Sequence, residues 1–235
     1  MAGFLPKIRR HMFSLTTMVL YERSMRDVAS LCVRSAGGLL FRELTPRDRA
    51  AFERGLALQG TRETTFQPAF GMKDVDDRLR SGERCFVCED GDRIAGYIWF
   101  STVDKHIREI DATLRLKDGD VYAYNAYVDQ EYRGGNITPS ILAEAGRVLL
   151  RGGSRRLLLV TMNWNENTHR TLRKADFLRD GNLRAGYFAT FRFFVNSCRN
   201  VNVSRNAGPF EFYGKLFRKV AAALSRGTAA RGRMV

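Results

Sequence analysis

The sequence predicts a mixed α/β domain over residues 37–197, with a helical extension at residues 1–36 and another at 198–235. The chain has 235 residues, 44% of them hydrophobic, which is enough for one sizeable core. Two apolar segments joined by a Gly-Asp-Arg turn within residues 84–103 indicate a β-hairpin. Two strand–helix units follow within residues 121–177, and such units usually share a sheet with their neighbours.

In the first half of the chain, caps and periodicity define the expected elements. Residues 1–36 join basic side chains to an apolar run, so we expect an amphipathic helix followed by a linker. Residues 38–44 alternate like a strand. Thr45 and Pro46 then suit the N-cap and the first position of a helix. A short polar helix is expected over residues 72–83.

In the second half of the chain, strands alternate with helices. The strands are recognised by alternating or continuous apolar residues between turn residues. They are expected over residues 84–90, 94–103, 121–128 and 155–163, and over residues 183–196 as one long strand or two short ones. Helices are expected from about residue 139, over residues 166–177 and over residues 208–227.

The chain is strongly basic, with a formal net charge of +14. Residues 1–50 carry nine Lys and Arg against four acidic residues, and residues 196–235 carry eight against one. Such arms attract polyanions. We expect them to allow peripheral contact with an anionic membrane. Nucleic acid stays open as a partner, although the arms show no known nucleic-acid motif.

The four cysteines are interpreted as reduced thiols. Cys85 and Cys88 have the spacing of a metal or redox pair, but they lie in an expected strand, where positions i and i+3 point to opposite faces. No second pair completes a zinc site, so we expect no metal. Reduced thiols indicate a cytoplasmic setting. No run of 18 apolar residues occurs, so no transmembrane segment is expected.

The segment EYRGGNITPSIL, residues 131–142, lies between an expected strand and an expected helix. A helix N-terminus offers free backbone N–H groups and the positive end of the helix dipole, and Arg133 adds a charge. This arrangement suits a pyrophosphate, although an ordinary strand–helix turn has the same outline. Thr138 followed by Pro139 is typical of an N-cap and a first helical residue.

The segment AYVDQEYRGGNITPSIL resembles the acetyl-CoA-binding motif of the GCN5-related N-acetyltransferases, V-x-P-x-x-R-G-x-G-I-G. Val128 stands at the valine of the motif, Gln130 at its proline, and Tyr132, Arg133 and Gly134 match the usual Y-R-G.

Downstream, NENTHRTLRKADF resembles the second family motif, N-x-x-(A/S)-x-x-x-Y-x-K-x-G-F, with Asn165, Lys174 and Phe177 in place. The resemblance covers roughly residues 38–196. It implies a mixed, mostly antiparallel central sheet that is flanked by helices and splayed between its two central strands.

The resemblance implies an acyl-CoA-dependent N-acyltransferase, most simply an N-acetyltransferase. The acyl group would move from acetyl-CoA or another acyl-CoA to a primary amine by direct attack in a ternary complex. The implied cofactor-binding residues are Tyr127, Val128, Arg133, Gly134, Gly135, Asn136, Ile137, Thr138 and Asn165. The alternative is a catalytically weak module that binds CoA or a carrier-protein pantetheine, or that serves as an interaction protein.

Two departures from the family pattern bear on this alternative. Asn136 replaces a glycine, but Asn tolerates left-handed backbone angles better than most residues. Leu172 replaces the tyrosine that often protonates the leaving thiolate in the family. His169 could replace that acid, although a lone helical histidine is more often a surface residue.

Tyr124 and Tyr122 are the candidate catalytic residues, because they stand four and six positions before Val128, where the family often has a base. A phenol is a weak base at neutral pH, but it can relay a proton or orient the amine. The alternative reading is plain β-propensity. Asn125 and Tyr127 should point the other way unless a bulge intervenes.

Overall fold

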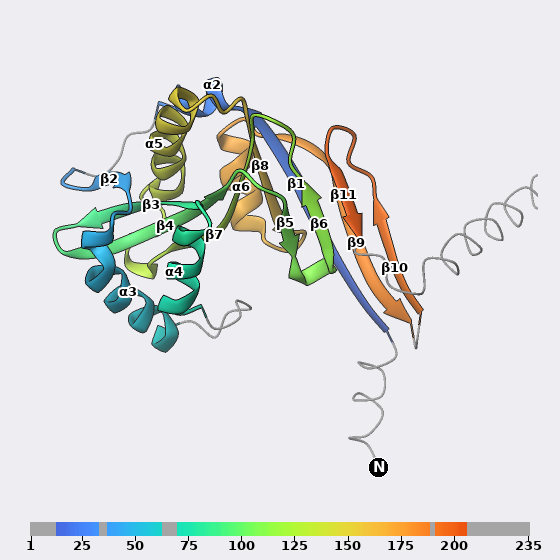
Figure 1. The fold of residues 1–235 in the computed structure, drawn as a ribbon, viewed down its shortest axis with the longest axis horizontal. Helices are drawn as coiled ribbons and strands as arrows, with labels where there is room; N and C mark the ends of the chain where they lie inside the picture. The colour runs from blue at the N-terminus through green and yellow to red at the C-terminus, as the bar shows by residue number, and fades with distance from the viewer. Residues whose placement is uncertain (1–12, 33–36, 63–69, 189–190, 206–235) are drawn as a thin grey trace, which may run out of the picture.

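The structure is a computed structural model that describes residues 13–32, 37–62, 70–188 and 191–205. An eight-stranded sheet forms its centre, with the strand order β10-β9-β1-β8-β7-β4-β3-β2 (Figure 1). Its strands are β1 (Phe13–Ser24), β2 (Leu40–Glu43), β3 (Arg84–Asp90), β4 (Arg93–Ser101), β7 (Asp120–Val128), β8 (Arg156–Met162), β9 (Leu178–Phe188) and β10 (Phe191–Asn196). Among the strands that the structure describes in this sheet, only β7 and β8 pair in parallel, so the predicted mixed, mostly antiparallel sheet is confirmed.

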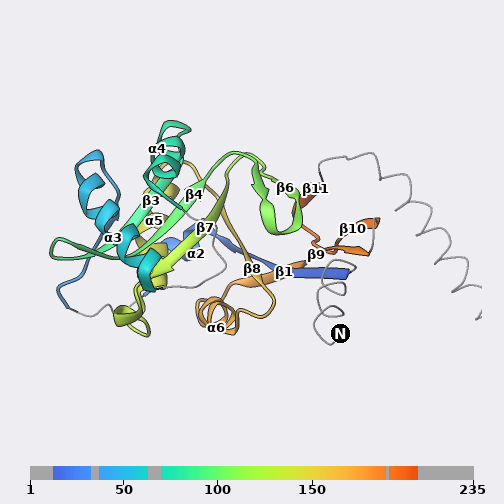
Figure 2. The same cartoon turned by 90° about the horizontal axis from the view of Figure 1, so that it is seen from below.

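Both faces of this sheet are covered (Figure 2). One face packs against α2 (Met25–Ala29), α5 (Ile137–Arg151) and α6 (Glu166–Lys174). The other face carries two separate layers. The first consists of the 3-10 turn η1 (Pro46–Asp48) and the helices α3 (Arg49–Arg62) and α4 (Met72–Arg80). The second is a small sheet of β5 (Lys105–Ile107), β6 (Ala112–Arg115) and β11 (Asn202–Arg205), with η2 (Arg108–Ile110) between β5 and β6.

The helix predicted within residues 1–36 is wrong for residues 13–24, which form β1 in the middle of the sheet. Met18 and Leu20 pack toward the small sheet, whereas Val19 and Tyr21 pack toward the helices α5 and α6. Because both faces of β1 are buried, its sequence lacks the polar alternation that usually identifies a strand. The first strand is therefore part of the domain and not an extension of it.

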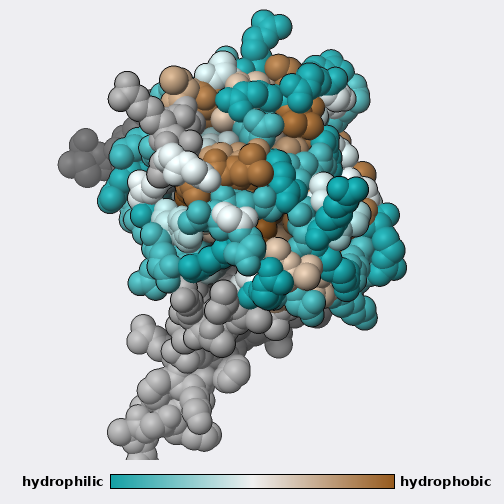
Figure 3. All heavy atoms as spheres, turned by 90° about the vertical axis from the view of Figure 1, so that its left-hand side faces the viewer, coloured by the Kyte–Doolittle hydropathy of each residue, from teal (hydrophilic) through white to brown (hydrophobic). Residues whose placement is uncertain are grey.

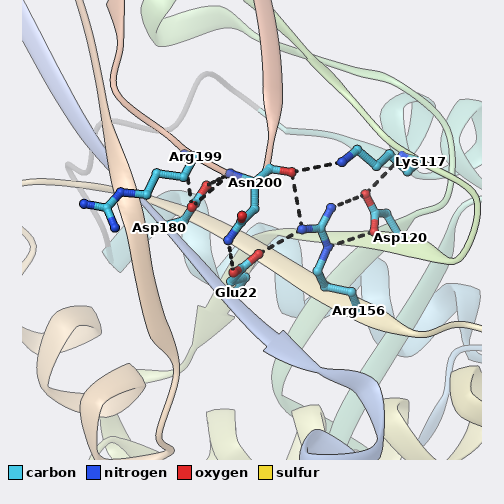
Figure 4. A network of polar contacts seen from close by, with 7 residues as sticks. All are labelled: Glu22, Lys117, Asp120, Arg156, Asp180, Arg199 and Asn200. Carbon is cyan, nitrogen blue, oxygen red and sulfur yellow. Dashed lines mark hydrogen bonds and ion pairs between the residues drawn. The ribbon is translucent and has the colours of Figure 1, made fainter.

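The chain just after residue 197 also belongs to the domain, because a polar network ties it to the sheet (Figure 4). Asp180 accepts hydrogen bonds from the backbone N–H of Asn200 at 3.1 Å, and the Asn200 side chain donates to Glu22 at 2.6 Å. Arg156 bridges Glu22 at 2.9 Å and Asp120 at 2.7 Å. Strands β1, β7, β8 and β9 are thereby joined to the loop that leads into β11.

The rest of the predicted C-terminal extension, including the basic helix over 208–227, lies outside the described residues, as do the basic side chains of residues 1–12. Contact with an anionic membrane therefore stays a prediction. Within the described ranges, no helix is long and apolar enough to cross a membrane.

The two cysteines with metal-type spacing are buried in β3 on opposite faces of the sheet, as predicted. Cys85 packs in the cluster beneath α3 and α4, and Cys88 packs in the cluster beneath α5. Burial raises the pKa of the Cys88 thiol to about 12 and that of Cys85 well above its usual value, so both are neutral thiols at physiological pH. Neither forms a disulfide.

Strand β2 is a short edge strand of four residues. The side of the molecule at which β2 and α3 lie is mostly hydrophilic, with apolar atoms gathered near its centre (Figure 3). A short edge among charged side chains offers little template for pairing with another chain.

Arg42 of β2 joins this edge strand to its neighbours. Its guanidinium donates to Asp48 of η1 at 2.6 and 2.7 Å and to Glu89 of β3 at 3.0 Å.

We expect Asp48→Asn to lower the free energy of unfolding by about 1–3 kcal/mol at pH 7. The Arg42 guanidinium, followed by the N–H and hydroxyl of Thr45, holds the pKa of the Asp48 carboxyl well below its usual range. A depressed native pKa stabilises the fold above the unfolded pKa of about 4, and this contribution is lost as the pH falls through the native value.

Urea unfolding between about pH 2 and pH 7 checks this prediction. The variant should lose part of the acid sensitivity of the parent. Asp77→Asn is the matched control, since Asp77 pairs with Arg80 at 2.5 Å on the exposed side of α4, with side-chain exposures of 51% and 74%. Equal unfolding curves for Asp48→Asn and Asp77→Asn at every pH would contradict the assignment.

Candidate active site

The two central strands of the sheet separate at one end, as predicted. Residues 120–123 of β7 pair in parallel with residues 156–159 of β8. Beyond that point Tyr124, Tyr127 and Val128 pair with β4, and residues 160–162 pair with β1. The splay therefore opens at Tyr124 and exposes backbone groups that a regular sheet would use for pairing.

A β-bulge lies at the start of this splay. Tyr97 of β4 is opposite Tyr127, and Trp99 is opposite Tyr124, so β7 carries one extra residue between the two pairs. Asn125 has a left-handed φ of 48° in the bulge. The bulge changes the side-chain parity, so that Tyr124 and Tyr127 both pack on the α3 and α4 side. The exception that sequence analysis allowed for a bulge therefore applies to Tyr127.

The loop between β7 and α5 turns through η3 (Gln130–Tyr132) and two left-handed residues. Gly134 has φ 85° and Asn136 has φ 59°, so the expectation that Asn can hold the position of the second family glycine is confirmed. Helix α5 begins at Ile137 with Asn136 as its N-cap. The N-cap predicted at Thr138 is therefore wrong, and Pro139 is the third helical residue and not the first.

This helix start presents backbone donors. The first hydrogen bond of α5 runs from the N–H of Ser140 to the carbonyl of Asn136 at 3.0 Å. The N–H groups of Ile137 and Thr138 precede it, at the positive end of the helix dipole, whereas Pro139 has no N–H to offer. Ile137 is 3% exposed, so it can offer only its backbone.

The β3–β4 hairpin holds the loop in place. Arg93 pairs with Asp129 at 2.7 Å and with Glu131 at 2.8 Å. The Tyr132 hydroxyl donates to Asp90 at 2.7 Å. These contacts clamp both ends of η3, so the donors beyond it are held in a fixed arrangement.

The remaining predicted cofactor residues lie in this loop, at the end of β7 and at the start of α6. Arg133 is exposed, and its Nε donates to the carbonyl of Val128 at 3.2 Å. The N–H of Gly135 bonds the carbonyl of Tyr132 at 3.3 Å. The centre of the Tyr127 ring lies 5.6 Å from that of Tyr97. Asn165 caps α6 by accepting the N–H of Thr168 at 3.2 Å.

The two candidate catalytic tyrosines have different surroundings, although their rings stack at 5.5 Å. Tyr122 is 6% exposed, and burial raises the pKa of its phenol above the usual value, which makes it a poorer base still. Tyr124 is partly exposed, and its hydroxyl donates to Glu83. Glu83 in turn pairs with Lys105.

Sequence analysis missed Glu83 and Lys105. They lie 41 and 19 positions before Tyr124, on the loop before β3 and on β5, and no local spacing relates them to β7. The cluster has a carboxylate that is 6% exposed at the side-chain level, a phenol and an ammonium group. Such a group can accept, hold and pass on a proton at the splay.

His169 differs from its prediction as a surface residue. It is 8% exposed, its Nδ1 lies 2.9 Å from the Tyr21 hydroxyl, and its Nε2 lies 3.1 Å from the carbonyl of Asn163. Both ring nitrogens are thus used to join α6 to β1 and to the loop after β8. Leu172 is buried in the core at 1% exposure, so its site carries no acid.

In the described part of the chain, no group of three or more His, Cys, Asp or Glu side chains is arranged to hold a metal ion.

A family model described as the acetyltransferase (GNAT) family matches residues 52–177, which is more than half of the chain. No curated protein matches this chain.

Among solved structures, a functionally unknown conserved protein from Staphylococcus epidermidis is 14% identical with a TM-score of 0.53, and the match covers 83% of this chain and 67% of that one. A Drosophila protein is 12% identical with a TM-score of 0.50, over 79% of this chain and 57% of that one. A GCN5-related N-acetyltransferase from Sphaerobacter thermophilus is 14% identical with a TM-score of 0.48, over 80% and 57%. The chain thus spans between about half and two thirds of the length of these proteins, and identities this low concern the fold alone.

Proposed function

Since this chain belongs to the GNAT acetyltransferase family, we propose that it moves an acyl group, most simply acetyl, from acyl-CoA to a primary amine. One observation supports assigning roles to individual residues. Tyr124, the first residue of β7 beyond its pairing with β8, is hydrogen-bonded to a buried carboxylate on the face opposite α5. The Glu83 carboxylate, which can accept a proton, is thus close to the opening between β7 and β8. The loop before α5 follows the end of β7 at the same opening.

For the acyl donor, we propose that Arg133 and the N–H groups of Ile137 and Thr138 bind the pyrophosphate of CoA. The left-handed backbone at Gly134 and Asn136 turns this loop toward the helix start. A phosphate oxygen suits N–H donors at a helix N-terminus. The backbone of Tyr127 and Val128 along the splay would hold the pantetheine, because it is not paired with β8.

The acyl-CoA would supply a thioester: a C–N bond to the amine replaces the C–S bond, and CoA leaves as the thiolate, which takes a proton from water. The chain's own contribution concerns the amine proton. We propose that the Tyr124 hydroxyl orients the amine and that Glu83 receives its proton through this hydroxyl, with Lys105 balancing the charge of Glu83. Tyr122 takes no part, since its phenol is buried.

We favour catalysis over the alternative of a module that only binds. The absence of a tyrosine at Leu172 removes one acid, but both the splay and the donors at the start of α5 are retained. A thiolate leaving group also needs less help from an acid than an alkoxide does, because a thiol is the stronger acid.

The test is native mass spectrometry of the purified protein for a retained CoA species, followed by an assay of free thiol release against an amine library. We expect retained CoA and thiol release with at least one amine. Retained CoA without thiol release across the library would support the binding module instead.

A further inference from the structure

Arg78 of α4 lies among aromatic rings on the face of the sheet that carries Tyr124. Its guanidinium carbon is 4.2 Å from the ring centre of Phe70, 4.9 Å from that of Tyr124 and 5.0 Å from that of Trp99. Such stacking fixes the plane of a guanidinium and orients its donors. Arg78 as a whole residue keeps partial exposure to solvent, whereas its Nη1 is buried, so a small ligand would have to enter beside the exposed part of the side chain.

Two donors of this cluster are buried without an acceptor in the described part of the chain. They are Nη1 of Arg78 and the indole Nε1 of Trp99, whose side chain is fully buried. Buried donors are nearly always hydrogen-bonded in native proteins, and leaving one unpaired is costly. A cluster with two unpaired donors is therefore complete only when acceptor oxygens are supplied to it.

The nearby carboxylates are hydrogen-bonded to or paired with other groups. Glu83 accepts from Tyr124 and pairs with Lys105, and Asp74 accepts the N–H of Gly71 at 2.9 Å to cap α4. Both act on Arg78 through their charge, but neither is hydrogen-bonded to its Nη1.

We propose that Arg78 determines acceptor specificity by binding a carboxylate of the acceptor, which makes the acceptor a small amino acid-type molecule. This rests on the proposed N-acyltransferase function. A carboxylate has two acceptor oxygens, and guanidinium groups bind it with good geometry. Tyr124 links the two halves of the site, since its hydroxyl faces Glu83 and its ring faces Arg78. The amine and the carboxylate would therefore be separated by a short chain.

The test is calorimetry with glycine, β-alanine and γ-aminobutyrate in the presence of CoA, each compared with its carboxamide. We expect at least one acid to bind the parent protein about tenfold or more tightly than its amide, and this preference to disappear in Arg78→Gln. Arg78→Lys should keep only part of it, because an ammonium group lacks the planar fork. Arg80→Gln, at an exposed arginine on the same helix, should keep all of it.

Turnover separates this inference from the proposed function. In Arg78→Gln, KM should rise for the acids by a larger factor than for amines without a carboxylate. Acetylation of acids and amides alike by the parent would overturn the inference and leave the function standing. Acid binding through Arg78 without any turnover would overturn the proposed function and leave Arg78 as a carboxylate-binding residue. A preference that survives in Arg78→Gln, or no binding of any probe, would overturn the inference, and thermal melts check that each variant folds.

Discussion

Tyr124→Phe is expected to lower kcat/KM for amine acetylation by about 10²-fold or more, with the affinity for acetyl-CoA unchanged. The substitution removes only the hydroxyl that donates to Glu83 at the start of the splay. The ring and its contacts with Tyr122 and Arg78 stay in place, so the fold should be retained. Steady-state kinetics with the best amine from the library gives the ratio.

The pH profile identifies the role of Glu83 in the same step. In the parent protein kcat/KM should rise with pH as the amine loses its proton. Glu83→Gln keeps a hydrogen-bond acceptor for Tyr124 but has no carboxylate to receive a proton. Its kcat/KM should therefore fall, and the increase of kcat/KM with pH should move to higher pH.

Tyr122→Phe serves as the control, because its buried phenol is 6% exposed and its raised pKa keeps it neutral. We expect its kcat/KM to stay within a few-fold of the parent value. A Tyr124→Phe variant as active as Tyr122→Phe would remove Tyr124 and Glu83 from the mechanism.

Gly134→Glu should weaken acetyl-CoA binding by about 100-fold or more, which corresponds to about 3 kcal/mol. Gly134 has φ 85°, a conformation that residues other than glycine rarely adopt, and it lies three residues before the first of the donors at the start of α5. A carboxylate here would repel the phosphates electrostatically and would reshape the loop. Isothermal titration calorimetry with acetyl-CoA measures the change.

Gly153→Glu provides a matched control at the other end of α5. Gly153 has φ 89°, and a Cβ added at either glycine would meet nothing within 4 Å. Both variants therefore carry the same backbone strain and the same new charge, but only one carries them beside the loop. Equal affinities for acetyl-CoA in the two variants would show that the phosphates bind elsewhere.

Much of the fold could be predicted from local signals. The hairpin of β3 and β4 follows from a Gly-containing turn between two apolar segments, and β8 follows from a continuous apolar run. The left-handed Asn136 and the loop before α5 follow from residue types that are specific to their backbone angles. These features depend on neighbouring residues in the chain, so the sequence contains them directly.

Only the tertiary structure decided which distant groups meet. β1 is a strand because β8 and β9 pair with it on both sides, a stabilisation that its own apolar run does not reveal. His169 is buried because Tyr21, 148 positions away, supplies a partner. Glu83 reaches Tyr124, and Arg78 lies over its ring, because α4 covers the face of the sheet that carries Tyr124 and Glu83 lies between α4 and β3. The sequence thus determined the family resemblance and pointed to the loop that we propose binds phosphate. The proposed proton acceptor and the proposed carboxylate-binding arginine depend instead on long-range packing, which local pattern cannot encode.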